Sequence, residues 1–360
     1  MQSYKCKLCG AILRWDEKSQ KLKCKYCDSV YDVSEFEDKT KDAKLDNKEE
    51  KDKSFTQEQN TDNNWVIYSC KNCGAEVVAG KSTMATVCAY CGSTISVTEK
   101  TAENFRPKKI IPYIVDKKQA MKIYKEYINS SKYVPDKFAE QAVIEKMQNL
   151  FAPFYLNSMR VEVEATASSE AELIERSGYD EVVTTKMYNS LIKMRGALKN
   201  IPTDASKKMP NNLMDALEPF DYSQVVDFNP AYMAGYIADQ PDEYAEEMME
   251  RAEQRSVSFI DNQVLKEVPH YSKRISGRNY KFINENSEYT MIPVWILNVN
   301  YKNKRYKFAI NGQTGKMVGE LPIDDKKLKK TCIKLPILFT LLFPLIGAFL
   351  YWVGIIRGFL

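Results

Sequence analysis

The chain has 360 residues, of which 28% are charged and 44% are hydrophobic, and its 52 basic and 48 acidic residues give a net charge of +4. These fractions exclude wholesale disorder and a collagen-like fibre, and a mean hydropathy of −0.45 excludes a polytopic membrane protein. A net charge this small, spread over the whole chain, argues against a dedicated nucleic-acid binder. His270 is the single histidine, which excludes metal sites built from several histidines.

Eight of the nine cysteines form two matched sets of C-x-x-C pairs, with fourteen residues between the two pairs of each set. The sets are Cys6, Cys9, Cys24 and Cys27, and Cys70, Cys73, Cys88 and Cys91. Adding 64 to a residue number maps the first set onto the second, and it also maps Tyr26 onto Tyr90 and Ser29 onto Ser93. The chain therefore contains an internal repeat of one small unit.

This spacing predicts two tetrahedral thiolate sites, because two residues between cysteines let one tight turn direct both sulfur atoms at a single ion. Gly10, Gly74 and Gly92 follow three of the pairs, where the turn favours a positive φ, and Asp28 takes the fourth place. Four ligands leave no open position, so we expect two structural Zn²⁺ ions. Spacing alone leaves iron in a rubredoxin-like site as the alternative. Disulfides of a secreted protein are disfavoured because Lys5 and Lys7 interrupt any apolar leader.

The charge of the two units favours protein contact over nucleic-acid contact. Residues 4–33 hold seven basic and four acidic side chains, so a zinc ion bound by four thiolates leaves about +1, and residues 68–97 come to about −1. Phosphate binding needs several unopposed cations. Trp15 and Tyr26 are able to stack on a base, but packing within a small zinc ribbon explains both side chains equally well.

Changes in composition along the chain predict an α+β protein with two small four-cysteine zinc ribbons, one mixed α+β domain and a C-terminal transmembrane helix. We expect zinc ribbons at 1–36 and 65–100, and a flexible charged linker at 37–64, which is nearly devoid of apolar residues. One mixed α+β domain is expected at 101–323, because strand and helix patterns there do not alternate strictly. A basic juxtamembrane segment at 324–334 and a transmembrane helix at 335–356 follow.

Within 101–323, local patterns predict several elements. A capping box formed by Asp116 and Gln119 marks the start of the first helix. The other expected helices are Pro135–Gln148 and Asp242–Lys266. The expected strands are Ile110–Val115, Phe154–Thr166, parts of 181–202, and a meander of Met291–Val299, Arg305–Ile310 and Lys316–Leu321.

The segment Leu335–Ile356 has 22 residues without a charge, which is long enough to cross the hydrocarbon core. Its N-terminal side carries Lys326, Lys327, Lys329, Lys330 and Lys334. We therefore expect a single-pass C-terminal anchor in the cell membrane, with residues 1–334 in the cytoplasm and the lysines at anionic headgroups. Cys332, beside the bilayer, is either acylated or an idle thiol.

The sequence offers no catalytic constellation, and we expect no enzyme activity. His270 lies in Val-Pro-His-Tyr without a nucleophile signature nearby. A Ser-x-x-Lys pattern at Ser206 fails because Met209 takes the lysine position. The stretch 79–83 resembles the end of a phosphate-binding loop, but Ala75 stands where that loop needs glycine. No small-molecule substrate is indicated.

Besides the first cysteine unit, several further segments of the chain are distinctive, namely Lys109–Tyr113, Ala152–Tyr155, Pro202–Lys207, Leu217–Tyr222, Phe228–Tyr236 and Phe308–Lys316. In these segments the chain resembles the bacterial membrane-anchored proteins, common in Firmicutes, that are described as TFIIB-type zinc ribbon-containing proteins. The resemblance covers nearly the whole chain. Some members are labelled relatives of the primosomal replication-restart helicase, although no Walker motif is present here.

This resemblance supplies no reaction and no catalytic residues. Related proteins are similar to components of membrane-stress assemblies that contain an SPFH-type scaffold and a phage-shock-type protein. We therefore expect a non-enzymatic adaptor that recruits protein partners to the inner face of the membrane. The alternative is a nucleic-acid-binding, replication-associated protein that acts through its ribbons.

Overall fold

A computed structural model describes residues 4–36, 65–80, 88–91, 93, 96–101, 107–141, 147–177, 180–332, 342, 343 and 345. The expected linker 37–64 lies outside these residues, as does Lys334. The expected transmembrane helix 335–356 also lies outside them, except for Leu342, Phe343 and Leu345. Among the described residues, no helix has the length and apolar composition required to cross a bilayer.

The fold is mixed α+β, as expected. A small sheet near the N-terminus has the order β1 (Leu13–Asp16), β2 (Lys21–Cys24) and β3 (Val30–Tyr31), and a 3₁₀ turn, η1 (Val33–Phe36), follows it. All other described strands belong to one large sheet. Its main path is β10 (Val226–Asp227), β7 (Lys109–Ile110), β12 (Tyr271–Tyr301), β8 (Gln148–Ser177), β11 (Ile237–Asp239), β5 (Glu76–Gly80), β4 (Trp65–Ser69) and β6 (Ser96–Thr101).

Three further strands extend this sheet. β13 (Lys304–Asn311) pairs with β12, β14 (Met317–Gly319) pairs with β13, and β9 (Asp180–Asp204) pairs with β8. The helices are α1 (Lys117–Ser130), α2 (Asp136–Gln141), α3 (Asn211–Asp215) and α4 (Ala245–Glu267), and two more 3₁₀ turns are η4 (Tyr222–Gln224) and η5 (Pro230–Met233).

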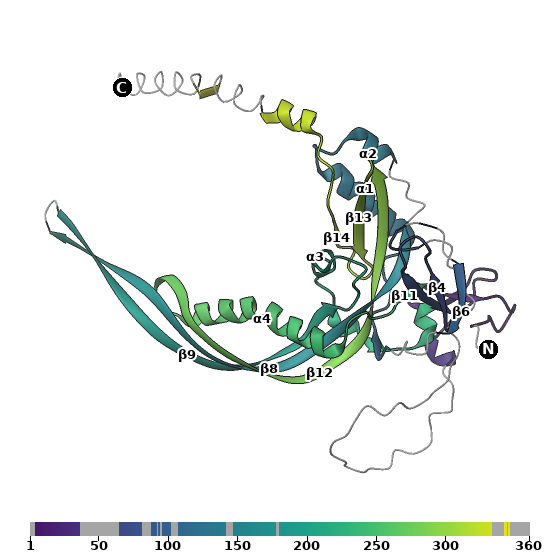
Figure 1. Cartoon of the computed structure of the whole chain (residues 1–360), viewed down its shortest axis with the longest axis horizontal. Helices are drawn as coiled ribbons and strands as arrows, with labels where there is room; N and C mark the ends of the chain where they lie inside the picture. The colour runs from purple at the N-terminus through teal and green to yellow at the C-terminus, as the bar shows by residue number, and fades with distance from the viewer. Residues whose placement is uncertain are drawn as a thin grey trace, which may run out of the picture.

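The most prominent feature is an arm formed by β8, β9 and β12, which are 30, 25 and 31 residues long. At about 3.3 Å per residue, β8 alone spans roughly 100 Å. Figure 1 shows these strands leaving the body as a curved ribbon, with α4 on the concave side. Ile260 and Val264 of α4 pack there on Val161, Val163 and Ala165 of β8.

The opposite face of the arm is polar because successive side chains of a strand point to opposite faces. Cross-strand ion pairs join Lys193 to Glu164 at 3.0 Å and Arg195 to Glu162 at 3.3 Å. All four side chains are largely solvated, so each pair contributes little to stability.

The body packs two apolar clusters against the sheet. Tyr113, at the centre of one cluster, is fully buried and stacks on Tyr236 with ring centroids 4.4 Å apart. Its hydroxyl donates to the Val294 carbonyl at 2.8 Å and accepts from the Leu150 N–H at 2.9 Å. One side chain therefore joins β8 to β12 at the base of the arm.

The local signals predicted the starts of the helices better than the lengths of the elements. The capping box at Asp116 is confirmed, with Gln119 N donating to Asp116 Oδ1 at 2.7 Å. The expected strand Ile110–Val115 was too long, because after Ile110 the N–H groups of Ile114 and Val115 bond to the Gly312 carbonyl instead of continuing a ladder.

The expected helix Pro135–Gln148 was also too long. α2 ends at Gln141, residues 142–146 lie outside the described residues, and β8 begins at Gln148. The other long elements were placed correctly, but the strands Phe154–Thr166 and Met291–Val299 are only parts of β8 and β12.

Two candidate metal centres

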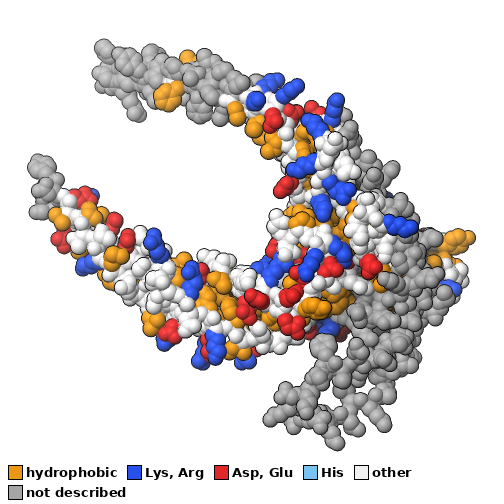
Figure 2. All heavy atoms as spheres, viewed as in Figure 1, with side chains coloured by type: hydrophobic (Ala, Val, Ile, Leu, Met, Phe, Trp, Pro, Cys, Tyr) orange, Lys and Arg blue, Asp and Glu red, His pale blue; other side chains and the backbone are white. Residues whose placement is uncertain are grey.

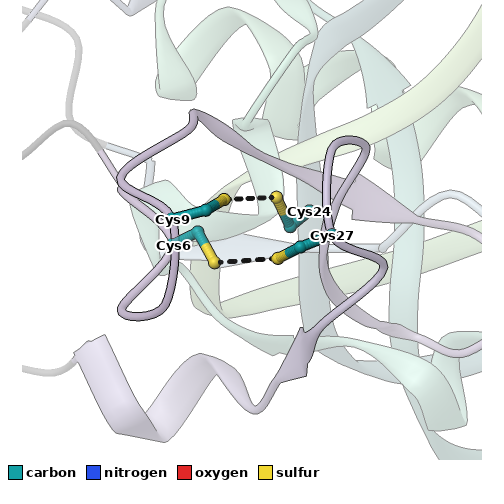
Figure 3. A group of neighbouring side chains, drawn as sticks. All are labelled: Cys6, Cys9, Cys24 and Cys27. Carbon is teal, nitrogen blue, oxygen red and sulfur yellow. Dashed lines mark hydrogen bonds between the residues drawn. The ribbon is translucent and has the colours of Figure 1, made fainter.

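The two sets of cysteines predicted from spacing come together in space. In each set the four sulfur atoms lie within 4.8 Å of one another. The sulfur atoms of Cys6 and Cys27 lie 3.5 Å apart, as do those of Cys9 and Cys24. Figure 3 shows the two pairs facing each other. In the second set the sulfur atoms lie 3.5 Å apart in Cys70–Cys91 and 3.7 Å apart in Cys73–Cys88.

These distances fit a metal site and exclude disulfides. A disulfide needs an S–S distance of about 2.05 Å. A tetrahedron of thiolates with metal–sulfur bonds of about 2.3 Å has edges of about 3.8 Å. Each set can therefore hold one ion with little movement, and the four ligands would close its coordination shell.

The local backbone explains how each pair presents its sulfur atoms. The N–H of Gly10 donates to the Cys6 carbonyl at 2.9 Å, and the N–H of Gly74 donates to the Cys70 carbonyl at 2.8 Å. Both glycines have a positive φ, +74° and +72°. Asp28 makes the same turn at φ 57°, with its N–H on the Cys24 carbonyl at 3.0 Å. The expectation that Asp28 substitutes for glycine here is confirmed.

The surroundings of the first set favour thiolates at some positions and oppose them at others. Burial acts to raise the pKa of Cys6, but hydrogen bonds from Ser29 at 3.0 Å and Tyr31 at 3.3 Å, with backbone N–H groups, lower it to about 5. At Cys9 the backbone N–H of Ala11 lowers the pKa, yet burial and the neighbouring thiols raise it to about 12. Four thiolates this close repel one another, so a cation is needed to hold them all ionised.

The first unit is docked on the body through β1. Trp15 is 6% exposed, and its indole N–H donates to the Tyr113 carbonyl at 3.3 Å. The Gln20 amide donates to the same carbonyl at 2.8 Å, and the Trp15 backbone N–H donates to the Ala234 carbonyl at 3.1 Å. Trp15 is therefore a packing residue, whereas Tyr26, the other candidate for base stacking, is 84% exposed.

The second unit is built into the large sheet. β5 pairs with β11 of the body through Val77–Asp239, Val78–Ala238 and Ala79–Ile237. Three of its cysteines, Cys70, Cys88 and Cys91, belong to the same apolar cluster as Leu150, Phe154 and Ile292. The Asn298 amide of β12 also donates to the Ala89 carbonyl, between two of the cysteines, at 2.8 Å. The sheet is thus continuous from 65–100 into 101–323, while the division into two domains there stays a prediction.

A buried polar network connects the second cysteine unit to the body. Tyr90, between Cys88 and Cys91, donates its hydroxyl to the carboxylate of Asp239, which is fully buried. The same carboxylate accepts from Ser206 at 2.6 Å, from Lys208 at 2.6 Å and from the Gln240 N–H at 2.8 Å. Four donors stabilise this buried carboxylate, so Asp239 is a structural anchor for the second cysteine unit.

Asp204 lies in the same region, and its carboxylate has fewer hydrogen-bond partners than that of Asp239. Burial raises its pKa to about 8, and the carboxylates of Asp239 and Asp215 act in the same direction, against the Ser206 N–H and Arg251. Its Oδ2 atom is buried without a hydrogen-bond partner among the described residues. Sequence reasoning did not single out Asp204 or Asp239, because their significance comes from contacts between distant segments.

The remaining predicted residues lie apart from both cysteine sets. Lys326, Lys329 and Lys330 are exposed, and Lys327 bonds to Asp136 of α2 at 2.6 Å. His270 is exposed at the end of α4 and stacks on Tyr188 of β9 with ring centroids 4.4 Å apart. Cys332 is exposed.

The segments that carry the family resemblance contact one another in the fold. Ala231 of the stretch 228–236 packs in the cluster that contains Cys6 and Leu13, so this stretch forms the platform for the first unit. The Asn311 amide donates to the carbonyls of Leu217 and Pro219 at 3.1 and 3.2 Å, which joins the stretch 308–316 to the stretch 217–222.

Comparison with curated proteins shows a similarity that covers most of the chain. The chain is 29% identical over 327 residues to a Bacillus subtilis (strain 168) protein named YdjG and described as uncharacterized, and the match covers 91% of this chain and 92% of that protein. No protein-family model matches the chain, and no solved structure matches it significantly.

Proposed function

We propose that this chain is a non-enzymatic adaptor that is anchored at the inner face of a membrane and presents its arm to a protein partner. The observation that carries the proposal is the outer end of the arm, where β8 and β9 continue without β12 beyond Glu170. Apolar side chains there are largely solvent-exposed. They are Leu173, Ile174, Val182, Val183 and Met187, with exposed fractions between 47% and 71%. Leu191, which is 58% exposed, lies nearer the body, opposite Thr166.

These side chains occupy both faces of the two-stranded end. Ile174 lies directly across from Val183, and Leu173, its neighbour in the strand, points to the opposite face. Figure 2 shows hydrophobic side chains along this part of the arm. A two-stranded ribbon cannot bury two apolar faces by itself, so the end of the arm fits a surface that another molecule covers.

Charge indicates the kind of partner. The stretch 170–191 contains five acidic side chains, among them Glu170 and Glu172, against two basic ones, Arg176 and Lys186. Negative charge repels the phosphates of nucleic acids and of anionic lipids. A protein with an apolar contact surface and a basic rim fits better, which favours the adaptor over the nucleic-acid alternative. SPFH-type scaffolds and phage-shock-type proteins are the candidates that the family resemblance suggests.

The proposed ions are two structural zinc ions, since the thiolates of each set close the coordination shell and leave no position for water. Metal analysis of the purified chain should give two zinc ions per molecule. Iron would produce a strong visible absorption instead, and that result would replace the zinc assignment.

The proposed anchor is the uncharged segment 335–356, with the lysines of 324–334 at the headgroups. Alkaline carbonate extraction of cell membranes should leave the full chain in the membrane pellet. A chain that carbonate releases would contradict the anchor, whatever the arm binds.

The adaptor itself is tested by proximity labelling with the full chain. The triple variant I174E/V183E/L191E places carboxylates on one exposed face of the arm, and we expect it to lose the membrane-scaffold proteins that the wild type labels. A matched control, S168E/T185E/N189E, adds three carboxylates at polar positions of the same face and should keep them. Equal labelling by both variants would contradict the role of the arm, and a list dominated by ribosomes or DNA-binding proteins would contradict the adaptor.

A further inference from the structure

The turn between β12 and β13 is a basic hairpin tip. Lys302 and Asn303 form its two central residues at positive φ, 49° and 60°, between the paired residues Tyr301 and Lys304. Positions 301–307 contain four basic side chains and no acidic one. Lys302, Lys304 and Arg305 are exposed, and none of the ion pairs among the described residues involves them.

Aromatic side chains support this tip. The rings of Tyr301 and Tyr306 each lie 5.3 Å from the ring of Phe138 in α2. The ammonium group of Lys302 lies 5.3 Å from the ring of Tyr301, and that of Lys304 lies 5.1 Å from the ring of Tyr306. The two lysine side chains therefore extend from a part of the hairpin that is packed on α2. A shallow, open pocket lies among them, lined by Asn300, Lys302, Asn303 and Arg305.

The tip lies at the same end of the molecule as the segment 324–332. The Asp324 N–H donates to the Tyr133 carbonyl at 2.8 Å, and Lys327 donates to the Val134 carbonyl at 2.8 Å, both beside α2. Since α2 contacts the hairpin through Phe138, the two basic segments flank one helix. Figure 1 shows β12 ending beside α2, where the chain turns toward its C-terminus.

We call the segments 131–138, 301–307 and 324–332 the basic end. They contain ten basic and three acidic side chains. One acidic side chain, Asp136, is already paired with Lys327, and Asp324 accepts the N–H groups of Lys326 and Lys327 at 2.9 and 3.3 Å. Positive charge is therefore in clear excess at this end, which suits a surface of phosphates.

We propose that the hairpin tip, Lys302–Arg305, is a second membrane-contact site that binds the phosphates of anionic lipid headgroups. Lipid is favoured over nucleic acid because the apolar segment 335–356 follows the basic end directly in the chain. If that segment enters a bilayer, the headgroups lie next to this end of the body. The inference rests on the proposed anchor and extends it, since two contacts fix the orientation of the body where one would leave it free to tilt.

Each cation near an anionic surface strengthens binding about five-fold, so loss of three cations should weaken the contact of the tip about a hundred-fold. The test variant is K302Q/K304Q/R305Q, which leaves Tyr301 and Tyr306 on Phe138. The control is K186Q/K266Q/R274Q, which removes the same charge from exposed positions of the arm and α4.

The experiment uses the full chain with a photo-crosslinking amino acid at Asn303, reconstituted into nanodiscs of phosphatidylcholine alone or with phosphatidylglycerol. We expect crosslinks to phosphatidylglycerol that persist in the control and fall at least ten-fold in the test variant. Suppose that carbonate extraction leaves the chain in the membrane. Crosslinking from Asn303 that is absent, or that is equal with and without phosphatidylglycerol, would then overturn the hairpin site and leave the anchor intact.

The same crosslinker separates the other outcomes. In cells, crosslinks from Asn303 to nucleic acid instead of lipid would overturn the proposal. If carbonate releases the chain, the proposed anchor fails on its own, and flotation with phosphatidylglycerol vesicles then decides the hairpin site. Flotation that the test variant loses and the control keeps would support the site, and flotation equal in both variants would overturn it.

Discussion

The two cysteine units share one sequence pattern but are integrated into the molecule in different ways. The first keeps its own three-stranded sheet and a small cluster with Leu13 and Leu22, and it is docked on the body mainly through Trp15. In the second unit, the hairpin is part of the large sheet, and three of the four cysteines are buried in the core of the body. The same metal-binding turn thus serves as an attached module in one place and as part of the core in the other.

The largest expected difference concerns the loss of a metal ligand. Cys88→Ser and Cys24→Ser replace equivalent residues, and each removes one of the four ligands of a site whose metal-binding free energy is on the order of 10 kcal/mol. Because β5 pairs with β11, Cys88→Ser should destabilise the body and lower the temperature of the main unfolding transition. Cys24→Ser should unfold residues 4–36 and leave that transition nearly unchanged.

Calorimetry together with hydrogen–deuterium exchange checks this difference. Exchange in β11 and at the base of β8 should rise in Cys88→Ser only. Equal protection of β11 in both variants would show that the second unit is as separable as the first.

The next largest effect concerns the contact between the first unit and the body. Trp15→Ala removes a buried indole that contacts Tyr232 at 4.9 Å between ring centroids. We expect a loss of roughly 3–5 kcal/mol in the docking of this unit, without loss of its metal. Hydrogen–deuterium exchange should then rise at the Trp15 position, whose backbone N–H bonds to the Ala234 carbonyl in the wild type. Tyr26→Ala, at an exposed position of the same unit, is the control and should change neither this exchange nor the metal content.

A smaller effect compares two tyrosines related by the repeat. Tyr90→Phe removes one of the four donors to the buried Asp239 carboxylate and should lower the free energy of unfolding by about 1–3 kcal/mol. Tyr26→Phe, its equivalent in the first unit, should leave the free energy unchanged because its side chain is 84% exposed. Urea denaturation of both variants measures the difference, and a null result for Tyr90→Phe would remove Asp239 as the anchor of the second unit.

The smallest effect is a pH dependence that comes from Asp204. Its pKa is raised to about 8 in the folded state, from about 3.9 in an unfolded chain. Between these values the folded state binds a proton that the unfolded state has released, so stability falls as pH rises through this window. The slope contributed is at most about 1.4 kcal/mol per pH unit.

Asp204→Asn should remove this slope, since an amide does not titrate. Urea denaturation at pH 6.5, 7.5 and 8.5 compares the two proteins in a range where the thiolates keep their metal. The wild type should lose stability relative to the variant as pH rises. Parallel profiles would show that Asp204 is ionised throughout.

Local interactions explain what could be predicted from the sequence. Both cysteine sets were predictable because each C-x-x-C turn is a complete ligand pair by itself. The start of α1 was predictable because Asp116 and Gln119 satisfy each other's backbone across three residues. Gly10 and Asp28 likewise mark turns through their own backbone preferences.

Contacts between distant segments explain what was missed. The outer part of β12, from Tyr271 to Asn286, is mostly polar because one of its faces is solvated, so it lacks the apolar run that indicates a strand. The pairing of β5 with β11 joins residues more than 150 positions apart and leaves no local signal. Trp15 could be read either as a nucleic-acid platform or as a core residue until its neighbour Tyr113 was known.

The length of the arm sets the distance between its outer end and the body. A partner bound at the outer end, as proposed, would be held at a distance from the body that the number of residues in the strands determines. Removing two residues from each strand beyond Glu170 would shorten the arm by about 7 Å without turning any side chain to the wrong side, because the strand repeat is two. Removing a single residue from each strand would instead turn every side chain of the outer end to the opposite face.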